Sequence, residues 1–295
     1  LTLGTRVMHL IETESGKTCK KHWRSTRRKM MKIITWNVNR FDGVWDWYHF
    51  KGDLAEEERE EHAKKIVEKL SELLTNPDDI AILQEIPYYN SWRRSENKKK
   101  EWNNKWKYFF ENFKVMFWFD NEQESKELFN LKAKNVTIAV AAKDSNWNLR
   151  SFQSKSKKII FGKTKGAYDY ANNYVELENG NMSMLGLHAN GKKEYWKQIH
   201  EATGKSDFSF IVGDFNVNDF LYPVDNELHK LETNYDRLID KDIITQNQTL
   251  TSIDNIFVKK GISSNAKIVV WDYCYIPETK GYAVRNTRYS DHNIC

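Results

Sequence analysis

The chain has 295 residues, of which 40% are hydrophobic and 14% aromatic, and these fractions indicate a packed globular protein rather than a disordered or fibrous one. Its apolar runs, such as FSFIV from Phe208, are too short to span a bilayer. The cysteines, Cys19, Cys274 and Cys295, form neither an even set nor a CxxC pair, so the sequence suggests no disulfide framework and no thiolate zinc site. We expect a cytoplasmic protein in a reducing compartment, without a membrane anchor.

The net charge of +5 is concentrated at the beginning of the chain. Residues 1–30 contain eight Lys or Arg and two Glu, which leaves 38 basic and 39 acidic residues for the remainder. This segment has no apolar period and no hydrophobic stretch typical of a secretory signal. We interpret residues 1–30 as a basic tail or an over-long reading frame outside the fold, and residues 31–295 as one domain. Overall basicity is therefore no argument for DNA binding.

From Met31 onward, short apolar runs alternate with amphipathic stretches, which is typical of a mixed α/β domain. The spacing of apolar residues predicts a helix between Asp53 and Leu74, ended by Asn76-Pro77, and Asn179-Gly180 predicts a hairpin turn. The predicted strands are KIITWNV from Lys32, DIAIL from Asp79, VTIAVAA from Val136, NYVELE from Asn173, NMSMLGL from Asn181, FSFIV from Phe208, SIDNIFV from Ser252 and AKIVVWDY from Ala266.

Polar residues of the kinds used in catalysis follow four of these apolar strands. They are Asn37 and Asn39 after KIITW, Gln84-Glu85 after DIAIL, His188 after SMLGL, and Asp214 with Asn216 after FSFIV. Asp254 within SIDNIFV and Ser290-Asp291-His292 near the end complete the set. Because strand ends that share one rim of a sheet assemble sites in α/β folds, we expect an acidic pocket with two imidazoles.

The residue types in this set narrow the chemistry. Carboxylate and amide oxygens without thiolates favour a hard cation such as Mg²⁺ or Mn²⁺. Histidines add proton transfer near neutral pH. A metal ion, a carboxylate that orients water and an imidazole together suit phosphoester hydrolysis. The sequence has no GxSxG, P-loop or GxGxxG motif that would indicate acyl transfer or nucleotide-cofactor chemistry.

Six motifs occur in a recognisable order between Met31 and His292: TWNVN, LQE, LHAN, GDFN, SIDNIFV and SDH. In these motifs the sequence resembles the endonuclease/exonuclease/phosphatase superfamily, whose members include deoxyribonuclease I and abasic-site endonucleases. The resemblance implies a four-layer α/β/β/α sandwich, in which two mixed sheets lie face to face with helices outside.

The resemblance also implies a metal site built from oxygen donors. Glu85 corresponds to the principal metal ligand of the family, and Asn37 and Asn39 correspond to residues that help to hold the metal or the phosphate. Asp291 corresponds to a second metal ligand. Mg²⁺ or Mn²⁺ is the implied cofactor.

The remaining motif residues correspond to the groups that act on water and phosphate. Asp214 would align or activate the attacking water, and Asn216 would donate a hydrogen bond to the phosphate. Asp254 would orient His292, which with His188 would form the acid/base or phosphate-contacting pair.

Two departures from the family pattern matter. Abasic-site endonucleases usually have an asparagine at the position of His188, so abasic-site repair is disfavoured. Family members also continue past the SDH motif into a closing strand, whereas here only Asn293, Ile294 and Cys295 follow.

Two positively charged tracts have two interpretations each. The stretch from Ser91 to Lys114 contains eight basic and three acidic residues with interleaved aromatics, and the tract from Arg150 to Lys165 contains six basic residues and no acidic one. Both tracts could bind a polyanion. The second could instead be a solvated hairpin, and the aromatics of the first could form the buried face of a helix, which we slightly favour. Those aromatics are Trp102, Trp106, Phe109, Phe110 and Phe113.

The sequence thus predicts a monomeric, divalent-metal-dependent phosphodiesterase. Among phosphodiesterases it favours a nuclease, with nucleic acid as the substrate. A phosphatase or phosphodiesterase for a lipid headgroup, an inositol phosphate or a nucleotide is the alternative within the same fold, and a catalytically silent binding module is the alternative outside it. The sequence gives no indication of a protein partner. The histidines outside the motifs are expected on the surface or in packing roles; they are His22, His49, His62, His200 and His229.

Overall fold

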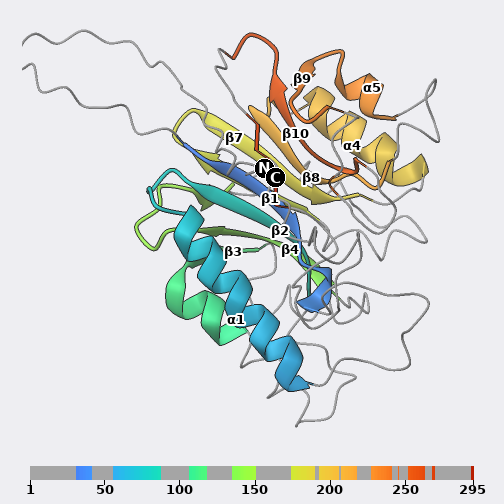
Figure 1. Ribbon diagram of the computed structural model, residues 1–295. Coiled ribbons are helices and arrows are strands. Elements are labelled where there is room, and N and C mark those ends of the chain that lie inside the picture. Colours follow the sequence, from blue (N-terminus) through green and yellow to red (C-terminus); the bar gives the residue numbers. More distant parts are fainter. Residues whose placement is uncertain are drawn as a thin grey trace, which may run out of the picture.

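Two β-sheets lie face to face, and helices cover the outer face of each sheet (Figure 1). The computed structural model describes most of the chain after residue 30. The described residues are 31–41, 56–87, 106–117, 135–150, 174–189, 193–205, 207–217, 227–240, 245, 252–262, 268–269 and 294–295.

The first sheet has four strands in the order β1-β2-β4-β3. Strands β1 and β2 are parallel, and the other neighbours are antiparallel. The strands are β1 (Ile33–Asn37), β2 (Ile80–Pro87), β3 (Lys114–Met116) and β4 (Asn135–Ala141).

The second sheet has six strands in the order β5-β6-β7-β8-β10-β9. Strands β7 and β8 are parallel, so this sheet is mixed as well. The strands are β5 (Asn148–Leu149), β6 (Tyr174–Asn179), β7 (Met182–His188), β8 (Phe210–Asp214), β9 (Tyr235–Arg237) and β10 (Asp254–Lys259).

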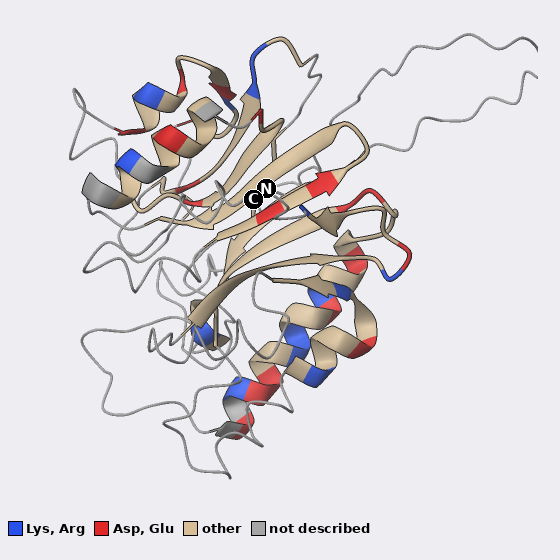
Figure 2. Ribbon diagram, turned by 180° about the vertical axis from the view of Figure 1, so that it is seen from behind, with Lys and Arg blue, Asp and Glu red and all other residues tan. Residues whose placement is uncertain are grey.

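The helices are sorted between the outer faces of the two sheets. Helix α1 (Glu56–Leu73) and the helical residues 106–112 cover the first sheet, and α4 (Lys193–Lys205) with α5 (Glu227–Leu231) cover the second. A short 3-10 turn, η1 (Asn39–Phe41), follows β1. Acidic and basic residues are interspersed along the solvent side of α1, as expected for a helix that buries its other face (Figure 2).

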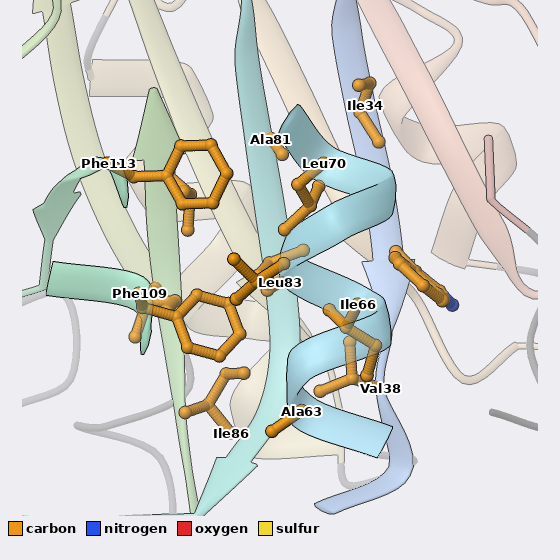
Figure 3. Close-up of a cluster of buried hydrophobic side chains, with 14 of the residues drawn as sticks. Ile34, Val38, Ala63, Ile66, Leu70, Ala81, Leu83, Ile86, Phe109 and Phe113 are labelled. Carbon is orange, nitrogen blue, oxygen red and sulfur yellow. The ribbon is translucent and has the colours of Figure 1, made fainter. Parts of the chain in front are cut away.

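Three apolar layers hold the two sheets and their helices together. Outside the first sheet, Ile66 and Leu70 of α1 pack with Leu83 and Phe109 (Figure 3). Between the sheets lie Ile33, Ile82, Met184, Val212 and Ile256. Outside the second sheet lie Leu185, Trp196, Ile199, Ile211 and Leu231. Helix, sheet, sheet and helix therefore follow one another, and the four-layer sandwich predicted from the sequence is confirmed.

Two glycines show how tightly these layers fit. A Cβ on Gly186 would lie 2.8 Å from Cγ2 of Ile82 in the opposite sheet, so the absence of a side chain lets the sheets approach. Gly180 has a φ of +58° in the turn between β6 and β7. The hairpin expected at Asn179-Gly180 is therefore confirmed.

The predicted helix after Asp53 and seven of the eight predicted strands are present, and the eighth, AKIVVWDY, is described only at residues 268–269. Strands β3, β5 and β9 were not predicted, because two or three residues are too few to display a period. Helices α4 and α5 were also missed. Cys295 pairs with β1 through reciprocal backbone hydrogen bonds to Thr35, of 2.7 and 3.0 Å, so Ile294 and Cys295 lie beside the first sheet.

For three of the aromatic residues after Ser91, the structure confirms that they form the buried face of a helix. Trp106, Phe109 and Phe113 are buried, whereas Phe110 is exposed and Trp102 lies outside the described residues. In the part of the chain that the structure describes, no helix is long and apolar enough to cross a membrane.

Candidate active site

Four of the predicted site residues lie on the inner faces of the two sheets, at corresponding ends of their strands. Asn37 continues the inward-facing row that begins with Ile33, because side chains two residues apart share a face. His188 and Asp214 continue the rows of Met184 and Val212 in the same way. His188 pairs with Asp214, and Asp214 pairs with Asp254, in the register of the sheet. The alternation read from the sequence thus brings these groups to one rim.

Glu85 reaches the same place only because β2 is irregular. Strict alternation would place Glu85 with Ala81 and Leu83, on the face that packs against α1. The pairing of β2 with β4 shifts register between Leu83 and Ile86, and Glu85 has a φ of +56°. A bulge of this kind re-aims a side chain. It turns the carboxylate of Glu85 toward Asn37, whose Nδ2 donates to Oε1 over 3.2 Å.

The side chains of Asn37, Glu85, His188 and Asp214 form one polar cluster. Nδ2 of Asn37 also donates to Oδ2 of Asp214 over 3.0 Å. Nε2 of His188 lies 3.7 Å from both Oε1 of Glu85 and Oδ2 of Asp214. The exposed fraction of the side chain is 1% for Asp214, 15% for His188 and 22% for Glu85. Two carboxylates from different sheets therefore share one amide and one imidazole, at a place that a ligand can reach.

The GDFN turn holds Asp214 in a fixed orientation. The backbone N–H of Asn216 donates to Oδ1 of Asp214 over 2.9 Å, and Nδ2 of Asn216 donates to the carbonyl of Ala189 over 2.8 Å. Gly213 is required here, because a Cβ would lie 1.9 Å from the carbonyl oxygen of Leu187. Oδ2 of Asp214 is consequently the oxygen that faces Asn37 and His188.

Backbone strain in the described residues is concentrated at this cluster. The non-glycine residues with positive φ are Asn39, Arg40, Phe41, Glu85 and Asn216, at +43°, +54°, +65°, +56° and +50°. Such conformations cost about 1–3 kcal/mol each and persist where the surrounding structure fixes them, which is typical of functional sites.

Asn39 and Arg40 belong to the strained turn that follows β1. The backbone N–H of Asn39 donates to Oδ1 of Asn37 over 2.9 Å, so its main chain orients the amide. Nε of Arg40 lies 3.5 Å from Oε2 of Glu85. Arg40 is not among the residues predicted from the sequence, because the motif that contains Asn37 and Asn39 gives no signal for the residue that follows it.

The side chains of this cluster include oxygen atoms that could bind a divalent cation. Among the described residues, no group of three or more His, Cys, Asp or Glu side chains is arranged to hold a metal ion. Mg²⁺, however, is commonly held by one or two carboxylates, with water and phosphate oxygens completing its shell. Glu85, with the amide of Asn37 beside it, fits that mode. Asp291, the second predicted ligand, lies outside the described residues.

Asp254 is fully buried on the inner face of β10, where the hydroxyl of Thr245 accepts from its backbone N–H over 3.0 Å. Its predicted partner His292 lies outside the described residues.

Three histidines outside the motifs have the packing or surface roles expected of them. Nδ1 of His62 donates to a backbone carbonyl in the core, and His200 and His229 contact glutamates in or beside α5.

No family model matches this sequence, and no curated protein matches it. Solved structures that are similar include truncated TDP2 from Caenorhabditis elegans, which is 12% identical over 89% of this chain and 94% of that chain, with a TM-score of 0.49. An AP endonuclease from Archaeoglobus fulgidus is 13% identical over 90% and 97% of the two chains, with a TM-score of 0.46. The endonuclease domain of TRAS1, a telomere-specific non-LTR retrotransposon, is 13% identical over 89% and 94%, with a TM-score of 0.44.

These three proteins have the deoxyribonuclease I-like endonuclease/exonuclease/phosphatase fold. The architecture of the chain itself, two mixed sheets between layers of helices, is the α/β sandwich that the sequence motifs predict.

Proposed function

We propose that this chain is a divalent-metal-dependent phosphodiesterase that hydrolyses nucleic acid. The observation that supports it most strongly is the bulge in β2, which turns the carboxylate of Glu85 inward to Asn37 and His188. A strand that served stability alone would keep its alternation and leave an apolar side chain toward α1. The irregularity therefore serves the polar cluster.

Glu85, with Asn37 and Asp291, would hold the cation. When bound, Mg²⁺ or Mn²⁺ neutralises negative charge on a phosphoryl oxygen. The carboxylate oxygens of Glu85 suit either ion, and Nδ2 of Asn37 would hold that carboxylate in place through its hydrogen bond to Oε1.

The residues of the chain would then handle water and protons. The fixed carboxylate of Asp214 would accept a hydrogen bond from the attacking water and take its proton as the O–P bond forms. His188 would donate a hydrogen bond to the phosphate through Nε2. His292, oriented by Asp254, would give a proton to the leaving oxygen, so that the proton balance closes.

The charge distribution supports a polyanionic substrate. The tracts 93–107 and 150–165 are strongly basic, although residues 31–295 as a whole contain 38 basic and 39 acidic residues. Most of both tracts lies outside the described residues, while Lys107 on the helix and Arg150 after β5 lie within them. A polyanion such as nucleic acid suits two such basic tracts in the sequence better than a small phosphoester does.

The test is hydrolysis by the purified protein with Mg²⁺ or Mn²⁺ and, separately, with EDTA. Plasmid DNA, single-stranded DNA, RNA, an abasic duplex, sphingomyelin and inositol phosphates should be compared side by side. We expect metal-dependent cleavage of nucleic acid, and a loss of at least about a hundredfold in Glu85→Gln, which removes the ligand charge and keeps the shape.

Glu178→Gln is the matched control, because Glu178 is an exposed glutamate at the far end of β6. Its activity should equal that of the wild type. Full activity in EDTA, or preferential turnover of sphingomyelin or inositol phosphates, would contradict the proposal.

A further inference from the structure

The turn after β1 is built to hold one side chain at the cluster. Its three residues, Asn39, Arg40 and Phe41, all have positive φ. The N–H of Asn39 donates to the side chain of Asn37, and the N–H of Phe41 donates to the carbonyl of Val38 over 2.9 Å. The chain therefore reverses sharply within the polar rim instead of leaving it.

The far side of the turn is anchored in the core. Phe41 is buried and stacks on Phe109, with ring centroids 6.0 Å apart. Its carbonyl accepts a hydrogen bond of 2.9 Å from Nδ1 of the buried His62. The backbone of Arg40 lies between these two anchored residues, so it cannot shift without breaking one of their contacts.

The side chain of Arg40 is 42% exposed, yet its Nε lies 3.5 Å from Oε2 of Glu85. The other oxygen of that carboxylate contacts Asn37 and faces His188. A guanidinium is a planar fork of N–H donors that stays charged at all physiological pH values. Arg40 therefore adds a permanent positive charge at the solvent side of a cluster that contains two carboxylates.

We infer that Arg40 binds the non-bridging oxygens of the phosphodiester group that is cleaved. This inference rests on the proposed function. A phosphodiester that enters the cluster must approach Glu85 and Asp214, which carry the same sign of charge. An arginine beside Glu85 offsets that repulsion and offers the bidentate geometry that phosphate oxygens accept. The strained turn fixes the backbone from which this side chain extends before the substrate arrives.

The first test is binding without turnover. Fluorescence anisotropy of a labelled single-stranded oligonucleotide in EDTA gives Kd as a function of salt for the wild type, Arg40→Gln and Arg40→Lys. We expect Arg40→Gln to weaken binding about tenfold or more and to flatten the slope of log K against log salt by about 0.7, the value for one single-strand phosphate contact. Arg40→Lys should keep the slope and lose part of the affinity, because it keeps the charge and loses the fork.

The second test identifies which phosphate is contacted. Bis(p-nitrophenyl) phosphate has one phosphodiester and no flanking phosphates. If Arg40 binds the scissile group, Arg40→Gln should raise KM for this compound and for the oligonucleotide alike. A rise confined to the oligonucleotide would overturn the inference, as would a fall in kcat with KM unchanged, which would mean that Arg40 acts only through Glu85.

Two variants separate binding from folding. Arg40→Gly should fold at least as stably as the wild type, because glycine adopts positive φ without strain, and should show the same loss of binding as Arg40→Gln. Lys260→Gln should bind like the wild type, because Lys260 is exposed and follows the end of β10 that lies opposite to Asp254. Unchanged Kd and salt slope in Arg40→Gln would refute the inference, whereas a wild type that binds and never cleaves would refute the proposed function alone.

Discussion

The two ends of the parallel pair β1–β2 carry similar residue types for opposite purposes. Where the strands begin, Asp79 accepts from the backbone N–H groups of Lys32, Thr75 and Asn76, each over 2.9 Å. Nζ of Lys32 donates to the carbonyl of Leu73 over 2.8 Å and lies 3.5 Å from Oδ2 of Asp79. The carboxylate and the ammonium are both buried, and the chain itself provides their partners.

Where the same strands end, the carboxylates are less fully surrounded by donors of the chain. Glu85 and Asp214 converge on the amide of Asn37, the backbone on both sides is strained, and the side chain of Glu85 is partly open to solvent. Asp79 has its charge met by buried donors of the chain, and losing one partner of such a pair destabilises the fold. Two acids held close together, one buried and one partly exposed, repel each other and suit an external cation. The difference between the two ends separates the structural acid from the proposed catalytic ones.

The largest expected effect is at the structural end. Asp79→Ala should lower the free energy of unfolding by about 3–5 kcal/mol, because it leaves the ammonium of Lys32 buried without its counter-charge. Chemical denaturation measures the change. Asp144→Asn, at an exposed turn, should unfold like the wild type. Glu85→Gln, at the other end, should match the wild type or exceed it in stability; a loss as large as that of Asp79→Ala would remove the distinction between the two ends.

At the site end, His188→Ala should lower kcat for nucleic acid hydrolysis by about a hundredfold, the usual scale for removing a positioned acid or base. Its unfolding midpoint should change little, because His188 sits at the end of β7 and is partly exposed. His229→Ala is the control, since His229 is a half-exposed residue of α5 paired with Glu232. Wild-type rates in His188→Ala would exclude this histidine from the mechanism.

The smallest expected effect is a dependence of stability on pH that comes from Cys295, which pairs with Thr35 midway along β1. Burial, together with the negative charge of Asp254, raises the pKa of the Cys295 thiol well above its ordinary value of 9.0. A thiol that stays protonated in the folded chain favours folding below its ordinary pKa, and this contribution is lost as the pH rises beyond it. Iodoacetamide at pH 8.5 with peptide mapping should therefore label Cys295 slowly in the native protein and rapidly in urea; equal rates would contradict the burial.

Much of the fold followed from alternation and motif order in the sequence. KIITWNV, FSFIV and SIDNIFV have clear strand periods, and these periods also place Asn37, Asp214 and Asp254 on the inner faces of the sheets. Local chemistry was sufficient for the helix after Asp53 and for the Asn179-Gly180 turn, since both depend on residues close in the chain. The catalytic roles of the motif residues remain predictions.

The sequence by itself thus determined the architecture and which strand ends carry polar groups. Only the tertiary structure decided that Glu85 points inward, because the bulge exists through the pairing of β2 with β4, about 50 residues further along the chain. The same holds for Arg40, whose place depends on Phe41 packing against Phe109 and His62. It holds also for Lys32 and Asp79, which are buried together because β1 pairs with β2. Long-range pairing sets these positions, and no local pattern encodes it.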